Sequence, residues 1–97
     1  MPDRFLHASH IVLDSREAAQ ELASKINRSK KVEKEFAKVA RKKSLCASAK
    51  KNGGDLGWIR ESRTPAEVSK AVWSQEPKKV GKPVETGRGF HIFLIHE

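Results

Sequence analysis

The stretch KPVETGRGFHIFLIH, residues 82–96, decides the fold of this 97-residue chain. It contains two segments with the composition of strands, 82–86 and 90–96, on either side of Gly87-Arg88-Gly89. Two glycines within three residues supply the positive φ angles that a tight hairpin needs. The stretch therefore predicts a β-hairpin.

Two more strands are predicted upstream of this hairpin. Residues 5–13 (FLHASHIVL) alternate, and apolar side chains fall on both alternating sets, as in a strand that is buried on both faces. Residues 56–60 (LGWIR) form a short apolar segment after a pair of glycines. The sheet is therefore expected to have four strands.

Helices are predicted between these strands. Asp14 is expected at an N-cap, with Glu17 completing a capping box, and the first helix should end near 27–28. A second apolar stripe predicts a helix over 32–43, whose basic end suits the negative end of the helix dipole.

The middle of the chain is expected to hold a loop, residues 44–55, and then a third helix. That helix should begin with Thr64 at the N-cap and Pro65 at the first helical position, and Pro77 should stop it. The resulting order is βααβαββ. It favours an α+β fold, a four-stranded and mostly antiparallel sheet surrounded by helices. Residues 1–97 are expected to form one domain.

The net charge of +8 is concentrated in one segment, residues 28–43. This segment holds eight Lys or Arg residues against two Glu, a local net charge of +6. Such a block can attract nucleic acid, an anionic surface or an acidic protein, although it is also typical of a solvated helix face. Phe36, the aromatic residue of this segment, is assigned to the core, which argues against a base-stacking platform.

Cys46 is the only cysteine, so no disulfide can form within the chain. The simplest interpretation is a monomer in the cytoplasm or another reducing compartment. The start of the chain has no basic region followed by an apolar stretch, so no signal peptide is expected. No apolar run approaches the ~20 residues that span a bilayer.

Three blocks of this sequence, in this order, resemble the parvulin family of peptidyl-prolyl cis/trans isomerases. They are ASHIVL (8–13), SLCASAK (44–50) leading into GGDLGW (53–58), and GKPVET (81–86) followed by GFHI (89–92). The resemblance covers essentially the whole chain. It implies a parvulin-like fold and non-covalent isomerisation of X-Pro bonds in flexible or unfolded protein segments, without a cofactor or a metal.

The resemblance also implies the site. The catalytic set would be His10, Cys46, Thr86 and His91, and the substrate-binding set would be Leu56, Thr64, Val68 and Phe90. The two histidines would pair on adjacent strands and bond to the threonine. The thiol would lie at the edge of a shallow prolyl pocket with the leucine on its floor.

Departures from the family pattern predict weak activity. Thr64 and Val68 stand where the family usually has Met and Phe, whereas Trp73, which stands where the family often has Phe, is expected to compensate in part by repacking. The loop Asp14-Ser15 is too short to be the basic loop of the phospho-directed members, so selectivity for phosphoserine-proline is not implied. A catalytically impaired module that binds proline peptides, with a chaperone role, is the alternative.

The chemistry needs no base, metal or nucleophile. Rotating an X-Pro bond breaks amide resonance, with a barrier of about 18–20 kcal/mol. The planar amide is more polar than the twisted transition state, so an apolar pocket with few donors to the carbonyl oxygen favours rotation. Small hydrogen-bonding residues around an apolar pocket are sufficient.

Other interpretations of these residues remain open. The histidine pair could be purely structural, and Cys46 could be a small buried apolar residue. His7 and His10 are poorly spaced for a metal, because positions three apart on a strand face opposite ways. A thiol protease would need an Asn or Asp orienting group, which is not evident. Trp58 and Trp73 are expected to fill the core.

Overall fold

The first and last strands of the chain, β1 (Phe5–Leu13) and β4 (Gly89–Ile95), lie side by side in the middle of a four-stranded sheet. The computed structural model describes residues 4–96, with residues 48 and 49 described by their backbone alone. β2 (Asp55–Arg60) pairs with β1, and β3 (Val84–Thr86) pairs with β4. The order is β2-β1-β4-β3, and every pairing is antiparallel.

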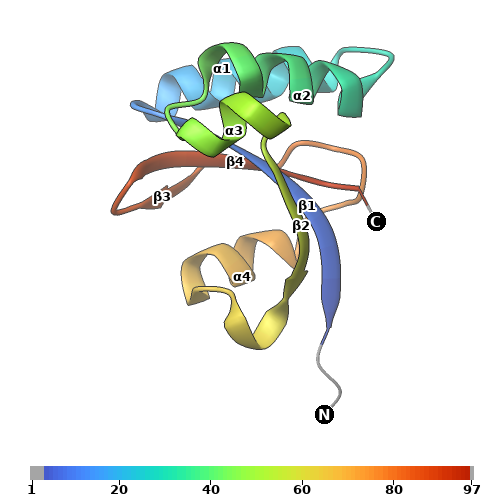
Figure 1. Ribbon diagram of the computed structural model, residues 1–97, viewed down its shortest axis with the longest axis vertical. Coiled ribbons are helices and arrows are strands. Elements are labelled where there is room, and N and C mark those ends of the chain that lie inside the picture. The colour runs from blue at the N-terminus through green and yellow to red at the C-terminus, as the bar shows by residue number, and fades with distance from the viewer. Residues whose placement is uncertain (1–3, 97) are drawn as a thin grey trace.

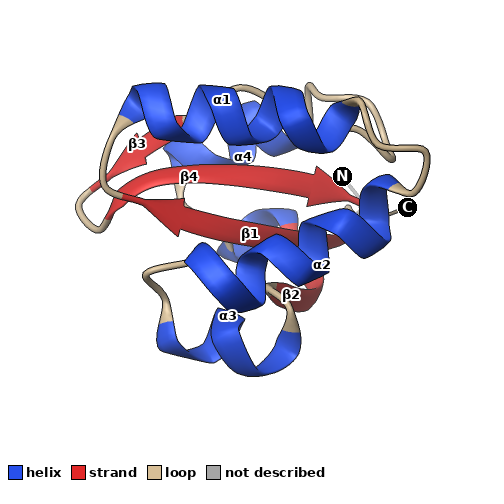
Figure 2. Cartoon of the chain, turned by 90° about the horizontal axis from the view of Figure 1, so that it is seen from above, coloured by secondary structure: helices blue, strands red, loops and turns tan. Residues whose placement is uncertain are grey.

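Helices cover both faces of this sheet. Helices α1 (Arg16–Asn27) and α2 (Val32–Lys43) lie on one side, and α4 (Ala66–Val72) lies on the other (Figure 1). The short α3 (Ala47–Asn52) follows α2 and leads into β2 (Figure 2). The predicted α+β class and the four predicted strands are confirmed.

The alternation of the central strands divides the interior into two cores. The larger core, under α1 and α2, includes Ile92 and Leu94 of β4. The smaller core, under α4, includes Phe93 and Ile95 of the same strand. Because successive strand residues point to opposite faces, β4 supplies both cores in turn.

Several details of the helices differ from the sequence-based expectation. Ser15, not Asp14, caps α1, because the Oγ of Ser15 accepts from the amide of Ala18 at 3.1 Å. Residues 47–52 form α3 inside the predicted loop, where this short helix packs against α2. The element order therefore gains α3 and, between β2 and α4, a single-turn 3-10 helix (Glu61–Arg63).

The start of α4 also differs. The backbones of Thr64 and Pro65 are both extended, with ψ of 131° and 146°, so the helix begins one residue later than predicted. Proline disfavours a helical conformation in the residue before it, which explains the extended Thr64. The hydroxyl of Thr64 donates to the carbonyl of Arg60 at 2.7 Å instead of capping the helix. Helix α4 ends at Val72, before it reaches Pro77.

The basic segment 28–43 covers α2 and the turn before it. All eight of its Lys and Arg residues are exposed, whereas Phe36 is 1% exposed and belongs to the larger core. The prediction for Phe36 is confirmed. Within residues 4–96, none of the helices has the length and apolarity to cross a membrane.

Asn27 ties the end of α1 to the segment before β3. Its Nδ2 donates to the carbonyl of Val80 at 2.9 Å, and its Oδ1 accepts from the Val80 amide at 2.8 Å. Replacing Asn27 with alanine is expected to cost about 2 kcal/mol, because two backbone groups of a buried residue lose their partners. Urea unfolding checks this, with the exposed Gln20→Ala on the same helix as the control, expected to change stability by less than about 0.5 kcal/mol. Equal effects of the two variants would contradict the prediction.

Candidate active site

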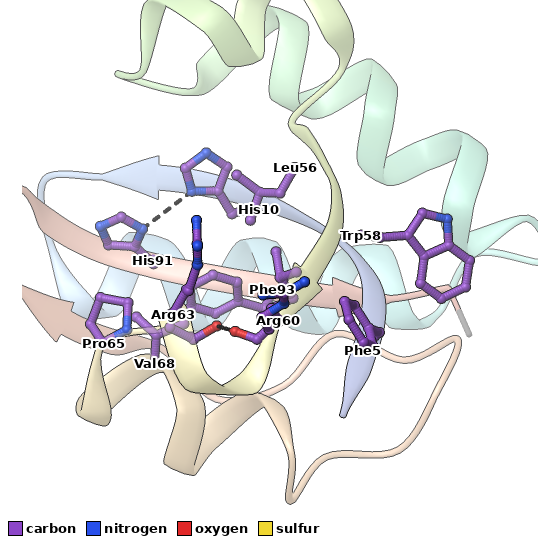
Figure 3. A pocket seen from close by; sticks show the side chains of 12 residues that line it. Phe5, His10, Leu56, Trp58, Arg60, Arg63, Pro65, Val68, His91 and Phe93 are labelled. Atoms are coloured by element: carbon purple, nitrogen blue, oxygen red, sulfur yellow. Dashed lines mark hydrogen bonds between the residues drawn. The ribbon is translucent and has the colours of Figure 1, made fainter. Parts of the chain in front are cut away.

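A cavity of about 590 Å³ opens between β2, α4 and the central strands (Figure 3). Most of its lining is apolar or aromatic. The lining residues are Phe5, His10, Leu56, Trp58, Ile59, Arg60, Arg63, Thr64, Pro65, Val68, His91 and Phe93. A partly apolar cavity with a few converging polar groups is the usual form of a ligand site.

Two buried histidines form one wall of this cavity. His10 of β1 and His91 of β4 lie on adjacent strands, and their Nδ1 atoms are 3.3 Å apart in a hydrogen bond. The Nε2 of His91 is 2.8 Å from the Oγ1 of Thr86, which in turn accepts from the amide of Arg88 at 3.2 Å. The hairpin turn is therefore linked through Thr86 to both imidazoles.

Both imidazoles are neutral at pH 7. Burial, followed by the charges of His91 and Arg88, lowers the pKa of His10 to about 4. Burial and the charge of Arg88 also lower the pKa of His91. A neutral imidazole has one donor and one acceptor nitrogen. In the bond between the two rings, one histidine therefore donates and the other accepts.

Phe93 forms the base of the site and was missed by sequence reasoning. It is 3% exposed, and its ring stacks with His91 (centroids 5.8 Å apart) and with His10 (6.2 Å). The signal was present in the sequence, because positions 91 and 93 of one strand must face the same side. An apolar ring behind two neutral imidazoles provides a dry surface against which a pyrrolidine ring can pack.

Leu56, Thr64 and Val68 all line the cavity, as the family resemblance implied. Leu56 lies on the edge strand β2 and is 41% exposed. Val68, on α4, also packs against the smaller core that contains Phe93. The structure thus brings these three residues together with the histidine pair.

The predicted role of Phe90 is wrong. Phe90 packs against the larger core on the α1 side of the sheet, and the guanidinium of Arg16 lies 5.2 Å from its ring centre. The side-chain alternation of β4 puts Phe90 on the face opposite to His91, so Phe93 takes the place in the site that Phe90 was expected to fill.

Cys46 is partly buried and is not among the residues that line the cavity. The Oγ of Ser44 accepts from the amide of Val12 at 3.1 Å, and the amide of Leu45 donates to the Val12 carbonyl at 2.9 Å. These bonds hold Ser44 and Leu45 against the same strand that carries His10. A part for the thiol in catalysis therefore stays a prediction.

His7 belongs to a different cavity, together with Asp55 and His96. Its Nε2 is 3.0 Å from a carboxylate oxygen of Asp55. His7 and His10 therefore do not converge, as their spacing on a strand indicated. Among residues 4–96, no group of three His, Cys, Asp or Glu residues is arranged to hold a metal ion.

Trp58 does not fill the core, contrary to the prediction. It is 59% exposed on the edge strand β2, stacks on His7 with ring centres 5.5 Å apart, and lines the cavity. Trp73 is partly buried and packs against the smaller core, as predicted.

Comparison with known proteins gives a consistent result. Residues 5–97 match the family model described as Rotamase, the PPIC-type PPIase domain. The chain is 31% identical over 90 residues to the foldase protein PrsA of Geobacillus sp. strain WCH70, which covers 93% of this chain and 31% of that protein. The chain thus spans less than a third of the length of the first curated relatives it matches.

Two solved structures illustrate the likeness. The crystal structure of PrsA from Bacillus subtilis superposes with a TM-score of 0.79 at 33% identity, covering 96% of this chain and 35% of that one. The solution structure of NmPin, described as the parvulin of Nitrosopumilus maritimus, has a TM-score of 0.82 at 22% identity, with both chains fully covered. The second likeness shows the fold alone.

Proposed function

Because the chain belongs to the family of PPIC-type peptidyl-prolyl isomerase domains, the parvulins, we propose that it isomerises X-Pro bonds in flexible or unfolded protein segments. The reaction is non-covalent and weak, and it does not depend on a phosphorylated residue. The observation that carries the proposal is the apolar cavity backed by the neutral His10–His91 pair and Phe93.

The cavity supplies what amide rotation requires. The proline ring packs against Phe93, Val68 and Leu56, and water is displaced from around the amide. The planar amide, whose oxygen carries partial negative charge, is then less well solvated than in water. The twisted state is less polar, so it loses little solvation free energy. The cavity therefore lowers the rotation barrier without bond breaking.

The histidine pair shapes this surface. Its hydrogen bonds to each other and to Thr86 engage three of the four ring nitrogens, so few donors remain to stabilise the planar carbonyl. Since burial keeps both rings uncharged, the wall does not stabilise the charged oxygen of the planar state. The pair is thus both a structural element and part of the catalytic surface.

Exchange spectroscopy on X-Pro peptides tests the activity. The rate of cis/trans exchange should rise in proportion to protein concentration. Uncatalysed exchange takes tens to hundreds of seconds. Unchanged exchange at stoichiometric protein would rule out catalysis. A phosphoserine-proline peptide should be no more than about threefold better than a glutamate-proline peptide, since both present an anion.

Replacing Val68 with phenylalanine is expected to tighten the binding of proline peptides about fivefold or more. The larger ring adds on the order of 1–2 kcal/mol of apolar contact in the cavity that Val68 lines. Peptide titration followed by chemical shifts gives the dissociation constant. Ala18→Phe, at an exposed position of α1, is the control and should leave it unchanged. Equal or weaker binding by the Val68 variant would show that α4 does not grip the proline.

A second candidate is a module that holds proline-containing chains without turnover. It is favoured by three exposed apolar residues, Phe5, Leu56 and Trp58, which all line the cavity. Peptide titration should then shift signals of these residues and of α4 without any gain in exchange rate. Shifts elsewhere, or none, would dismiss this candidate.

The exposed basic segment 28–43 supports a further role for the domain, in binding nucleic acid, acidic protein or an anionic surface. Such binding should weaken steeply with salt. Affinity for a DNA duplex that is absent, or flat between 50 and 200 mM salt, would exclude the nucleic-acid form of this role.

We also propose that the domain works as a monomer, and that it works in a reducing compartment because its single cysteine, Cys46, cannot form a disulfide within the chain. Sedimentation measures the first property and cell fractionation the second. A stable dimer or an oxidising compartment would contradict the respective proposal.

A further inference from the structure

The charged side chains that line the cavity have one sign. They are Arg60 and Arg63, and no described carboxylate lines the cavity. Arg63 lies in the connection between β2 and α4, and Figure 3 shows its side chain extending over the cavity in the direction of His10 and His91. The guanidinium of Arg60 lies 5.2 Å from the ring centre of Phe5. A bound peptide therefore meets positive charge beside an apolar floor.

The nearest carboxylates in the sequence have other partners. Glu61, between the two arginines, forms an ion pair with Arg4. Asp55, at the start of β2, accepts from the amide of Gly57 at 2.7 Å and bonds to His7 in the neighbouring cavity. Asp55 lines the neighbouring cavity, and neither carboxylate is among the residues that line this one.

A third arginine extends this potential to the histidine wall. Arg88, in the hairpin turn between β3 and β4, is close enough to His10 and His91 to disfavour a positive charge on either ring. By the same Coulomb interaction, the positive charge of Arg88 attracts an anion bound near the two rings. Positive charge therefore flanks the cavity at the β2–α4 connection and at the β3–β4 turn.

We propose that the preferred substrates carry aspartate or glutamate next to the proline, with Arg63 as the residue that determines this preference. The inference rests on the proposed isomerase function, because it names the substrate class of the same site. The proline ring occupies the apolar floor, and the flanking carboxylate lies among the guanidinium groups. Guanidinium suits this role, since it offers several donors to a carboxylate in fixed geometry.

The experiment compares kcat/KM for matched peptides that differ beside the proline: glutamate, glutamine and lysine, placed before it and, in a second set, after it. Glutamate is expected to exceed glutamine about three- to tenfold in at least one set, with lysine the poorest in that set. The advantage should shrink as salt is raised from 50 to 500 mM, because these charges are solvent-accessible. Equal rates for all three peptides in both sets would overturn the inference while leaving the isomerase function intact. Absence of catalysis on every peptide would instead defeat the proposed function.

Arg63→Glu assigns the preference to one side chain. The glutamate-to-lysine ratio is expected to fall at least about tenfold and to invert. Lys25→Glu makes the same charge change at an exposed position of α1 and should keep the wild-type ratio. If both variants lower the ratio equally, the preference comes from overall charge, and Arg63 is not its determinant. Arg63→Lys should retain much of the preference, which a purely structural role of the arginine would not predict.

Discussion

Replacing Gly54 with alanine is expected to unfold much of the protein, whereas the same change at Gly57 should cost only about 1–2 kcal/mol. Both glycines have positive φ, +84° and +72°, so both variants carry the conformational penalty of an L-residue in this region. The two positions differ in the space that is available for an added Cβ atom. A Cβ at Gly54 would lie 2.3 Å from the backbone oxygen of His10, whereas a Cβ at Gly57 has nothing within 4 Å.

The clash at Gly54 cannot be relieved locally. The carbonyl of Gly54 accepts from the amide of His10 at 2.9 Å, so the two backbones are held at close distance. On its other side the added Cβ would lie 3.2 Å from the Cβ of the fully buried Ala40. Moving away from β1 breaks the hydrogen bond and leaves buried polar groups unpaired. Together with the strain, this should cost more than about 3 kcal/mol.

Thermal unfolding followed by circular dichroism separates the two variants. The midpoint of a domain of this size shifts by about 4–8 °C per kcal/mol, and this sensitivity is the same for both variants. The midpoint should therefore always fall further in the Gly54 variant, by at least about 12–24 °C, than in the Gly57 variant, by about 4–16 °C. Since such domains have only about 5–15 kcal/mol in total, the Gly54 variant should be partly unfolded at 37 °C. Equal shifts of the two midpoints would show that the close approach to His10 is not what requires glycine.

This glycine also bears on function. The contact fixes the strand that carries His10, on the segment that joins the end of α3 to β2. The GGDLG block is thus a steric requirement of the histidine wall. A variant that folds with a displaced β1 should lose isomerase activity in parallel with stability.

Local patterns were sufficient to predict the strands and the long helices. The alternation of residues 5–13 gave β1 its observed bounds, and the apolar stripe of residues 32–43 gave α2 its observed bounds. Helix starts were less accurate, because Asp14 and Ser15 are both good capping residues and only the fold selects one. Segment α3 is short, and its helix depends on packing against α2 more than on its own propensity.

Predicting the site required information about residues that are far apart in the sequence. His10 and His91 are separated by 81 positions, and periodicity alone cannot pair them; the family resemblance supplied that pairing. The two wrong predictions have different sources. The prediction for Phe90 follows a family motif and neglects the side-chain alternation of β4, which the sequence contains. The prediction for Trp58 fails because β2 lies at the sheet edge. The position of a strand within its sheet is a property of the fold, and a strand sequence does not state it.

Lowering the pH from 7.5 to 4.5 is expected to destabilise the protein by about 2–3 kcal/mol through His10. The pKa of this buried imidazole falls to about 4 in the folded protein, from an ordinary value of 6.5. Between these two values the unfolded chain binds a proton that the folded protein does not, so stability declines as the pH falls from about 6.5 towards 4. His91, whose pKa is also lowered, acts in the same direction.

Urea unfolding at several pH values measures this decline. The range should stop at pH 4.5, because the pKa of Asp55 is also lowered, so this group adds a loss of its own once the pH falls below its ordinary value of 3.8. His10→Gln cannot titrate at this position and should flatten the profile, although it is expected to be less stable than the wild type at pH 7.5 since the bond to His91 is altered. A ring-proton titration of His10 with a midpoint near 6.5 would contradict the prediction, as would constant stability between pH 7.5 and 5.

The isomerase activity should also depend on the protonation of His10, because a charged imidazole beside the cavity would bind the polar planar amide better than the twisted one. Isomerisation is therefore expected to slow only when the pH approaches 4–5, well below the ordinary midpoint of a histidine.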